Sequence, residues 1–190
     1  MSGNSVSHPL ENVVKKEKSA DLSDKKECIF QNTNGKKQTI VIREMQVKDV
    51  SAVAVLEAMC FSEPWSEQAF LDALKQTEAL LLVAVGMDDK PLGYCGIYLS
   101  ADEGEITNVA VCPDYRKRGI ADAILTAVFA KAQKRGTQTV YLEVRESNIS
   151  AQKLYEKHGF VSCGIRKNFY RKPTEHAIVM CSDLTRRINE

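Results

Sequence analysis

The stretch from Asn108 to Arg135 places the strongest constraint on how this chain can fold. Residues 109–111 form a short β-favouring run, and Pro113 ends it because proline has no amide hydrogen to donate to a neighbouring strand. Beyond a short turn, apolar residues recur at the spacing of a helix with one buried face, namely Ile120, Ala123, Ile124, Ala127 and Val128. The sequence therefore predicts a strand, a tight turn and a helix in direct succession.

The turn between this strand and this helix is basic and contains a glycine. Arg116, Lys117 and Arg118 precede Gly119, and the small residue Ala121 follows. The first turn of a helix has backbone N–H groups without partners and lies at the positive end of the helix dipole, so it normally favours acidic residues. Three bases at this position therefore indicate an external anion, and the turn has the parts of a phosphate-binding site. A solvated basic turn is the alternative interpretation.

Other ligand motifs are missing from the chain. It has neither the GxxxxGK[ST] loop of Mg-nucleotide hydrolases nor the GxGxxG turn of dinucleotide-binding folds. Its six cysteines form no C-x-x-C pair and have no histidine at zinc-finger spacing. We therefore expect reduced thiols and no metal. A catalytic thiol at Cys112, beside the basic turn, is the less favoured alternative.

The order of predicted elements indicates an α+β domain. Residues 1–38 are rich in charged and small polar residues and lack an apolar period, so we expect a disordered extension followed by one domain over residues 39–185. The predicted strands are residues 39–43, 79–85, 92–99, 105–111, 139–144, 160–165 and 177–181. The predicted helices are residues 49–61, a second helix beginning at Ser66, the helix after the basic turn, and residues 148–158. This order, β-α-α-β-β-β-α-β-α-β-β, predicts a mixed sheet flanked by helices.

Charge and hydropathy limit the partners that the chain can have. The net charge is only +1, so no global field attracts nucleic acid and an anion site must be local. No apolar run approaches the ~18 residues of a membrane span, and the N-terminus lacks the apolar region of a secretory signal. We therefore expect a cytoplasmic protein that binds neither membranes nor nucleic acid directly. The oligomeric state stays open.

Three ordered motifs resemble the GNAT superfamily of N-acetyltransferases. The basic turn matches the R-x-x-G-x-A form of that superfamily's acyl-CoA signature. The segments from Phe61 to Ser66 and from Leu142 to Phe160 are similar to the branch that acetylates the N-terminal alanine of bacterial ribosomal proteins. The resemblance covers roughly residues 39–183. It implies the GNAT-type mixed sheet, with acetyl-CoA as the co-substrate and no metal.

The resemblance also implies which residues bind. Those that would hold acetyl-CoA are Val109, Ala110, Val111, Arg116, Lys117, Arg118, Gly119, Ile120, Ala121, Asp122 and Asn148. Asp122 stands where the family often has a basic or small residue, which would weaken phosphate affinity slightly. Asn148 can instead be an ordinary helix cap, and both roles are compatible. Phe61 and Trp65 would form the wall of a peptide-binding groove, although packing of Trp65 in the core is at least as good an interpretation.

Two residues are candidates for proton transfer. Alternation along the strand puts the side chains of Glu143 and Leu142 on opposite faces of the sheet. From the residues alone, Glu143 can therefore be a solvent-facing glutamate or the partner of an arginine. Tyr155, beside Leu154, can be a core aromatic. The resemblance makes Glu143 the proton acceptor for the amine. It makes Tyr155 the general acid, since a phenol stays protonated at neutral pH.

The implied activity is direct acetyl transfer from acetyl-CoA to the N-terminal alanine of a small-subunit ribosomal protein. Acetylation of lysine side chains or of a small-molecule amine is the first alternative. A non-catalytic acyl-CoA-binding module is the second, and the presence of both Glu143 and Tyr155 argues against it.

Overall fold

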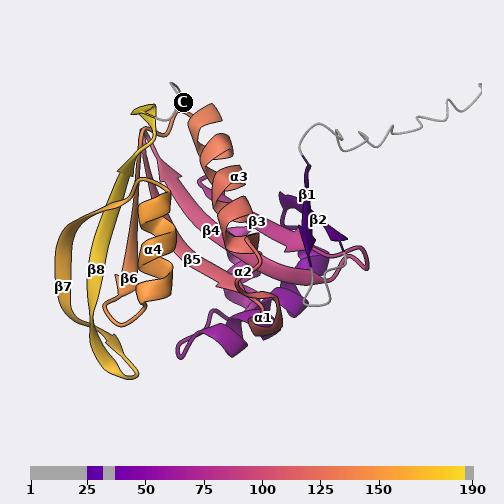
Figure 1. Ribbon diagram of the computed structural model, residues 1–190, viewed down its shortest axis with the longest axis horizontal. Helices are drawn as coiled ribbons and strands as arrows, with labels where there is room; N and C mark the ends of the chain where they lie inside the picture. Colours follow the sequence, from indigo (N-terminus) through magenta and orange to yellow (C-terminus); the bar gives the residue numbers. More distant parts are fainter. Residues whose placement is uncertain (1–24, 32–36, 187–190) are drawn as a thin grey trace, which may run out of the picture.

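The computed structural model describes residues 25–31 and 37–186, which form one mixed sheet with helices on both faces (Figure 1). The strands are β1 (Lys26–Gln31), β2 (Lys37–Glu44), β3 (Ala79–Val85), β4 (Pro91–Ser100), β5 (Glu103–Val111), β6 (Thr139–Arg145), β7 (Val161–Arg171) and β8 (Thr174–Asp183). The helices are α1 (Val50–Cys60), α2 (Glu67–Ala73), α3 (Ile120–Lys134) and α4 (Ile149–Lys157). The sheet order is β1-β2-β3-β4-β5-β6-β8-β7. Within the described residues β5 and β6 form the one parallel pair, so the predicted α+β fold with a mixed sheet is confirmed.

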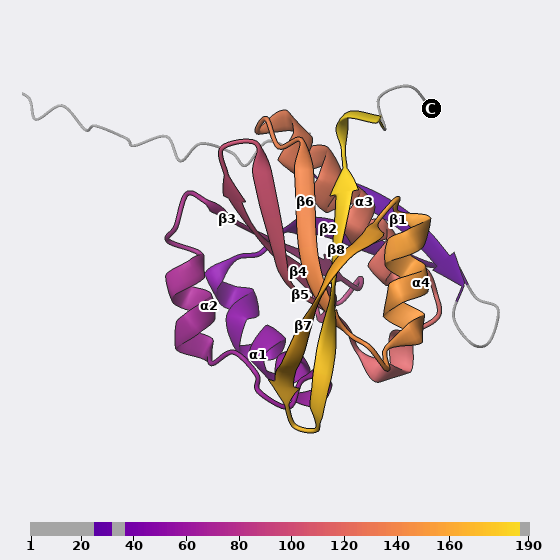
Figure 2. The same ribbon diagram turned by 90° about the vertical axis from the view of Figure 1, so that its left-hand side faces the viewer.

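Strand β3 shows why the sheet is covered on both faces. Its sequence ALLLVAV is a continuous apolar run, the pattern of a strand that is buried on both sides. Leu80 and Leu82 belong to the core that contains the buried face of α3, whereas Leu81 and Val83 pack with buried residues of α1 and α2. Figure 2 shows α1 and α2 on one side of the sheet and α4 on the other. Two cores therefore share the same central strands.

The parallel strands β5 and β6 pair along only part of their length. Their register runs from Glu103 opposite Thr139 to Ile106 opposite Leu142, and it ends there. Between β4 and β5 the register shifts at this same point and leaves Thr107 as an extra residue. A bulge of this kind bends its strand. β5 and β6 therefore separate beyond Ile106 and leave an opening in the sheet that the sequence pattern did not reveal.

The N-terminal boundary of the predicted domain is wrong. Lys26–Gln31 falls in the segment expected to be disordered, yet it forms β1, which pairs antiparallel with β2 from Lys26 opposite Ile42 to Gln31 opposite Lys37. β2 itself begins before residue 39. An edge strand can be short and rich in charge, so its pattern resembles that of an unfolded tail. The remainder of the predicted extension, residues 1–24 and 32–36, lies outside the described residues.

The C-terminal hairpin is longer than predicted. β7 continues past Ile165 to Arg171, and β8 begins three residues before Ala177, at Thr174. The prediction stopped early because residues 166–168 are polar and interrupt the apolar pattern. The hairpin lies at the edge of the sheet opposite β1 (Figure 1). Its added half supplies residues to the site described next.

Candidate active site

Two cavities meet where β5 and β6 separate. The first, of about 570 Å³, is lined by β5, the basic turn and the first turns of α3 and α4. The second, of about 500 Å³, is lined by the α1–α2 connection, β5, β6 and β7. The residues that line both cavities are Cys60, Phe61, Val109, Asn148, Ala151 and Tyr155. A molecule in one cavity can therefore touch a molecule in the other.

The first cavity brings together all the predicted acetyl-CoA ligands except Arg118. Its predicted members are Val109, Ala110, Val111, Arg116, Lys117, Gly119, Ile120, Ala121, Asp122 and Asn148. Arg118 is held elsewhere, because its Nη2 donates to the carbonyl of Asp114 at 2.5 Å and its guanidinium lies over the Tyr115 ring at 4.9 Å from the centroid. The sequence alone could not show which of the three adjacent basic side chains points into the cavity.

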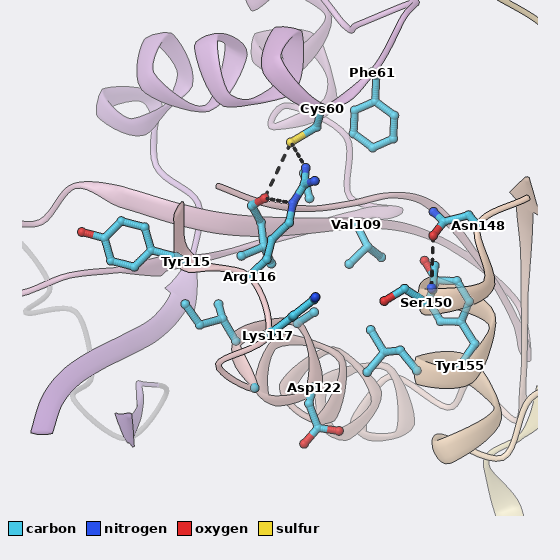
Figure 3. A pocket seen from close by; sticks show the side chains of 17 residues that line it. Cys60, Phe61, Val109, Tyr115, Arg116, Lys117, Asp122, Asn148, Ser150 and Tyr155 are labelled. Atoms are coloured by element: carbon cyan, nitrogen blue, oxygen red, sulfur yellow. Dashed lines mark hydrogen bonds between the residues drawn. The ribbon is translucent and has the colours of Figure 1, made fainter. Parts of the chain in front are cut away.

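The basic turn is shaped to expose backbone amides. Gly119 is the N-cap of α3 with a φ of 80°, a left-handed conformation that glycine adopts without strain, and Lys117 has a φ of 58°. The amides of the next three residues are the first of the helix and have no intrahelical partner. Lys117 extends its ammonium group toward the middle of the cavity (Figure 3). Backbone donors, a positive helix end and one cation thus converge, as a phosphate requires.

The other residues of this wall have structural partners. The Nε of Arg116 donates to the carbonyl of Val111 at 3.0 Å, and its Nη2 lies 3.4 Å from the sulfur of Cys60. Asp122 accepts from Lys157 at 2.8 Å and lies 2.9 Å from the Nε2 of His158. Burial alone would raise the pKa of Asp122, but these two groups hold it below its usual range. The charge of Asp122 is therefore compensated by Lys157 and His158 at the end of α4. It is not directed at the basic turn and the first turn of α3 (residues 116–122, hereafter the cradle).

Replacing Ala121 tests the cradle directly. Ala121→Glu should weaken CoA binding about ten- to hundredfold, because a carboxylate would occupy the place of a phosphate and remove its charge-assisted hydrogen bonds. Folding should not suffer, since an acidic residue in the first helical turn is favourable by about 0.3–1 kcal/mol. Calorimetry of CoA binding and a thermal melt measure the two effects. Ala121→Gln adds similar bulk without charge and should lose less affinity. Wild-type affinity in Ala121→Glu would place the phosphates elsewhere.

Glu143 lies at the point where the two parallel strands separate. It is the first residue of β6 beyond the pairing with β5, and it lines the second cavity. Its Oε1 accepts from Arg166 at 2.7 Å, which fixes the carboxylate from the β7 side. The hydroxyl of Tyr170 donates to the backbone carbonyl of Glu143 at 3.3 Å. The second carboxylate oxygen has no protein partner within the described residues and is available to an amine or a water.

Tyr155 lies on α4 at the junction of the two cavities. Its side chain is 8 % exposed, and its ring packs against Phe160 with centroids 5.8 Å apart. Burial raises the pKa of the Tyr155 hydroxyl, so the group stays protonated. Within the described part of the chain this hydroxyl has no hydrogen-bond partner. The core-aromatic interpretation and the proton-donor interpretation are thus compatible.

Strand β5 presents backbone groups to the junction. The amide of Cys112 donates to the carbonyl of Leu92 in β4 at 2.8 Å. Because backbone groups alternate along a strand, the N–H and C=O groups of Val111 and Val109 point away from β4. The carbonyl of Val111 accordingly accepts from Arg116. The groups of Val109 face the opening that the departure of β6 leaves. An N–H at this place can polarise a carbonyl oxygen.

Arg145 connects the walls of the second cavity. It donates to Ser62 of the α1–α2 connection at 3.4 Å, to Glu175 at 3.2 Å and to the carbonyl of Lys172 at 3.0 Å. Its guanidinium also covers the Tyr170 ring at 4.1 Å. The sequence prediction assigned neither Arg145 nor Tyr170 to the site. Tyr170 lies beyond the predicted end of its strand. A single arginine thus links β6, the β7–β8 hairpin and the α1–α2 connection.

Phe61 and Trp65 both line the second cavity, and their role in a peptide-binding groove stays a prediction. Trp65 also packs against Phe70, with ring centroids 5.4 Å apart. Asn148 is the N-cap of α4 and accepts from the amide of Ala151 at 3.2 Å. These residues therefore combine a structural contact with a place on a cavity wall.

Glu57 is a buried carboxylate that the prediction missed. Its side chain is fully buried, and its Oε1 accepts from the amide of Trp65 at 3.2 Å and from the side chain of Asn108 at 2.9 Å. The hydroxyl of Tyr94 donates to its Oε2. Glu57 is the one charged residue in the helix sequence VSAVAVLEAMC, a signal that could have identified it. It joins the α1–α2 connection to β5 beside the second cavity.

Burial raises the pKa of Glu57, which leads to a prediction about stability. Because the ionised form is disfavoured in the folded protein, this group stabilises the fold most at low pH. That contribution is lost as pH rises from about 4 through the raised pKa. Glu57→Gln can keep all three hydrogen-bond partners and does not titrate. Its stability relative to the wild type should therefore grow between about pH 4 and 7 in urea unfolding experiments. Parallel pH profiles of the two proteins would contradict this.

Two kinds of feature are missing from the described residues. No group of three or more His, Cys, Asp or Glu residues there could hold a metal ion. In residues 25–31 and 37–186 no helix is both long enough and apolar enough to cross a membrane.

The chain is similar to a known family and to curated proteins. Residues 50–160 match the model of the acetyltransferase (GNAT) family. The ribosomal protein bS18-alanine N-acetyltransferase of Escherichia coli K12 is 36 % identical over 143 residues, which cover 73 % of this chain and 94 % of the relative. The protein of the same name from Haemophilus ducreyi is 33 % identical over 143 residues, with 74 % and 97 % covered.

Solved structures show the same likeness. The crystal structure of the E. coli ribosomal-protein-S18-alanine N-acetyltransferase has a TM-score of 0.70 and 31 % identity, and the match covers 76 % of this chain and 94 % of that one. A chain of the NatC complex bound to Gag peptide and CoA has a TM-score of 0.69, with 76 % and 98 % covered. At 23 % identity, that second likeness concerns the fold alone.

Proposed function

This chain belongs to the GNAT family of acetyltransferases and is an acetyl-CoA-dependent acyltransferase, and from that premise we propose that it acetylates the N-terminal α-amine of a protein. We infer further that the substrate is a small-subunit ribosomal protein that begins with alanine, the residue in the names of its relatives. One observation carries the proposal. Tyr155 lines both cavities, whereas Glu143 lines only the second.

That arrangement gives each cavity a role. The amides of Ile120 to Asp122 and the ammonium group of Lys117 would hold the phosphates of acetyl-CoA in the first cavity. The thioester would lie at the junction, where the amide of Val109 faces the opening and can polarise its carbonyl. The acceptor amine would enter through the second cavity, between the α1–α2 connection and the β7–β8 hairpin.

The proton transfers follow from the two positions. Glu143 takes a proton from the acceptor amine, directly or through a water, and the neutral amine attacks the thioester carbon. The oxyanion then collapses, the carbon–sulfur bond breaks, and Tyr155 gives its proton to the departing thiolate. The new amide nitrogen loses its second proton, which restores the Tyr155 phenol through water, and Glu143 releases its own proton to water. An α-amine has a pKa near 8 and a lysine side chain one near 10.4, so the α-amine asks less of the base. Glu143 alone can therefore serve as the base for the proposed substrate class, an N-terminal α-amine.

The test is a set of acceptors that share one reaction mixture with acetyl-CoA. It contains a ribosomal-type peptide that begins with alanine, the same peptide blocked at its N-terminus but carrying lysine, and a polyamine. Mass spectrometry should find acetylation of the alanine terminus. Preference for the lysine or the polyamine would overturn the substrate class. Binding of CoA without acetylation of any of the three acceptors would overturn the proposed substrate class and favour the binding-module alternative.

A further inference from the structure

Two thiols face each other across the C-terminal hairpin, outside both cavities. Val161 of β7 pairs with Cys181 of β8, Ser162 pairs with Met180, and Gly164 pairs with Val179. Cys163 is therefore the extra residue of a β-bulge. Its position is diagonal to Cys181 on the neighbouring strand.

The two thiols interact across the bulge. Cys163 donates to the carbonyl of Val179 at 3.5 Å, which turns its sulfur toward β8. Burial raises the pKa of the Cys181 thiol, and a hydrogen bond with the Cys163 thiol raises it further. Cys163 is exposed and Cys181 is half-buried. One thiol is thus open to solvent and its neighbour is sheltered behind it.

No other cysteines are paired in this way in the described ranges. Cys28 is half-buried, Cys60 and Cys112 are half-buried against one core with no hydrogen bond between their thiols, and Cys95 is fully buried. All six are free thiols. A pair of interacting thiols on exposed β7 and half-buried β8 needs a reason, because neither belongs to a core as Cys95 does.

We propose that Cys163 and Cys181 form a reversible disulfide when the protein meets a peroxide. The exposed Cys163 thiolate attacks one oxygen of hydrogen peroxide, the O–O bond breaks, and Cys163 becomes a sulfenic acid while the other oxygen leaves as water after taking up protons. The sheltered Cys181 then attacks the sulfenic sulfur, an S–S bond forms, and a second water leaves. A dithiol and one peroxide thus give a disulfide and two waters. A dithiol reductant reverses the reaction.

The geometry suits this modification. Diagonal neighbours on regular strands lie further apart than a disulfide allows, but the strands are not regular here, because the extra residue at the bulge bends β7 and disrupts the ladder locally. Among the described strands, β7 lies at the edge of the sheet and pairs with β8 alone. It can therefore shift toward Cys181 without disturbing its pairing with a second strand. Exposure along nearly the whole of β7 gives the oxidant access.

The bond would act on the acceptor side of the protein. β7 carries Arg166, which holds Glu143, and Phe169 and Tyr170, which line the second cavity. No described residue of β7 or β8 lines the first cavity. Oxidation should therefore raise the KM for the acceptor peptide and leave CoA affinity unchanged. This last expectation rests on the proposed function, whereas the disulfide does not.

The experiment oxidises the reduced full chain with hydrogen peroxide and blocks the remaining thiols with N-ethylmaleimide. Trypsin cuts after Arg166 and Arg171, so Cys163 and Cys181 fall on different peptides. We expect a mass loss of about 2 Da, a linked pair of these two peptides, and reversal by dithiothreitol. Cys163→Ser should abolish the link, and the matched control Cys28→Ser should keep it. In Cys181→Ser, dimedone should trap a sulfenic acid at Cys163.

The outcomes separate clearly. Both cysteines recovered as maleimide adducts after oxidation, or links through other cysteines only, would overturn the proposal. Dimedone labelling of Cys181 in Cys163→Ser that is as fast as labelling of Cys163 in Cys181→Ser would overturn the order of the two steps. A linked pair in a chain that acetylates no amine would support the disulfide while the proposed function fails.

Discussion

Glu143→Gln should slow acetyl transfer by about 10²- to 10⁴-fold, the contribution expected of a positioned base. The glutamine keeps an oxygen to accept from Arg166, so the β6–β7 contact and the second cavity should survive. CoA affinity should not change, since Glu143 does not line the first cavity. The rate deficit should shrink as pH rises, because the acceptor amine then loses its proton without help. A pH–rate profile with saturating acetyl-CoA and an alanine-starting peptide measures this.

The matched control is Glu103→Gln, the same chemical change on the neighbouring strand at a residue that lines neither cavity. It should turn over like the wild type. A Glu143→Gln protein as fast as this control at every pH would exclude Glu143 as the base. A deficit that stays constant with pH would mean that Glu143 positions the substrate rather than taking its proton.

Tyr155→Phe should also cost about 10²- to 10⁴-fold in rate, but with a different dependence on pH. The ring remains, so its packing against Phe160 and the shape of the junction should be kept. Only the proton donor for the departing thiolate is lost. Raising the pH should not restore the rate, because the amine was already deprotonated normally. A pH–rate profile of Tyr155→Phe over the same pH range as for Glu143→Gln compares the two variants.

Tyr141→Phe is the control for this second variant, since Tyr141 lies on β6 but lines neither cavity. A wild-type rate in Tyr155→Phe would remove the hydroxyl from the mechanism and leave it as part of the core. Partial rescue by an acetyl donor whose leaving group needs no proton, such as the acetyl thioester of a more acidic thiol, would support its role as the acid.

Much of the fold followed from local patterns. β3 coincides with its predicted bounds because a short continuous apolar run that ends in turn residues is typical of a fully buried strand, and α3 begins where the basic turn ends. The failures lie at the two edges of the sheet. β1 begins with the exposed charged residues Lys26 and Glu27, and the distal half of β7 is exposed, so neither segment shows the alternation of a half-buried strand. Their strand structure comes from backbone pairing with β2 and β8.

The site was predictable to the extent that it is continuous in sequence. The basic turn and α4 each supply neighbouring residues to one cavity, and Arg118 departs only because its side chain turns to Asp114. Arg145 and Glu57 act through contacts more than 20 residues away, for example with Glu175 and with Asn108. The opening between β5 and β6 depends on a bulge at Thr107, which has no marker in the strand sequence.

The two-sided burial of β3 has a consequence for amide hydrogen exchange. Helix α3 packs on one face of this strand, and helices α1 and α2 pack on the other. The backbone amides of β3 can therefore exchange only when both helical layers open. Their exchange therefore follows global unfolding, and a ligand that binds only the folded state slows it by the factor 1 + [L]/Kd. β7, exposed along almost all its length, should exchange through local opening instead. Deuterium uptake at β3 should thus fall as CoA concentration rises, although no residue of β3 lines either cavity.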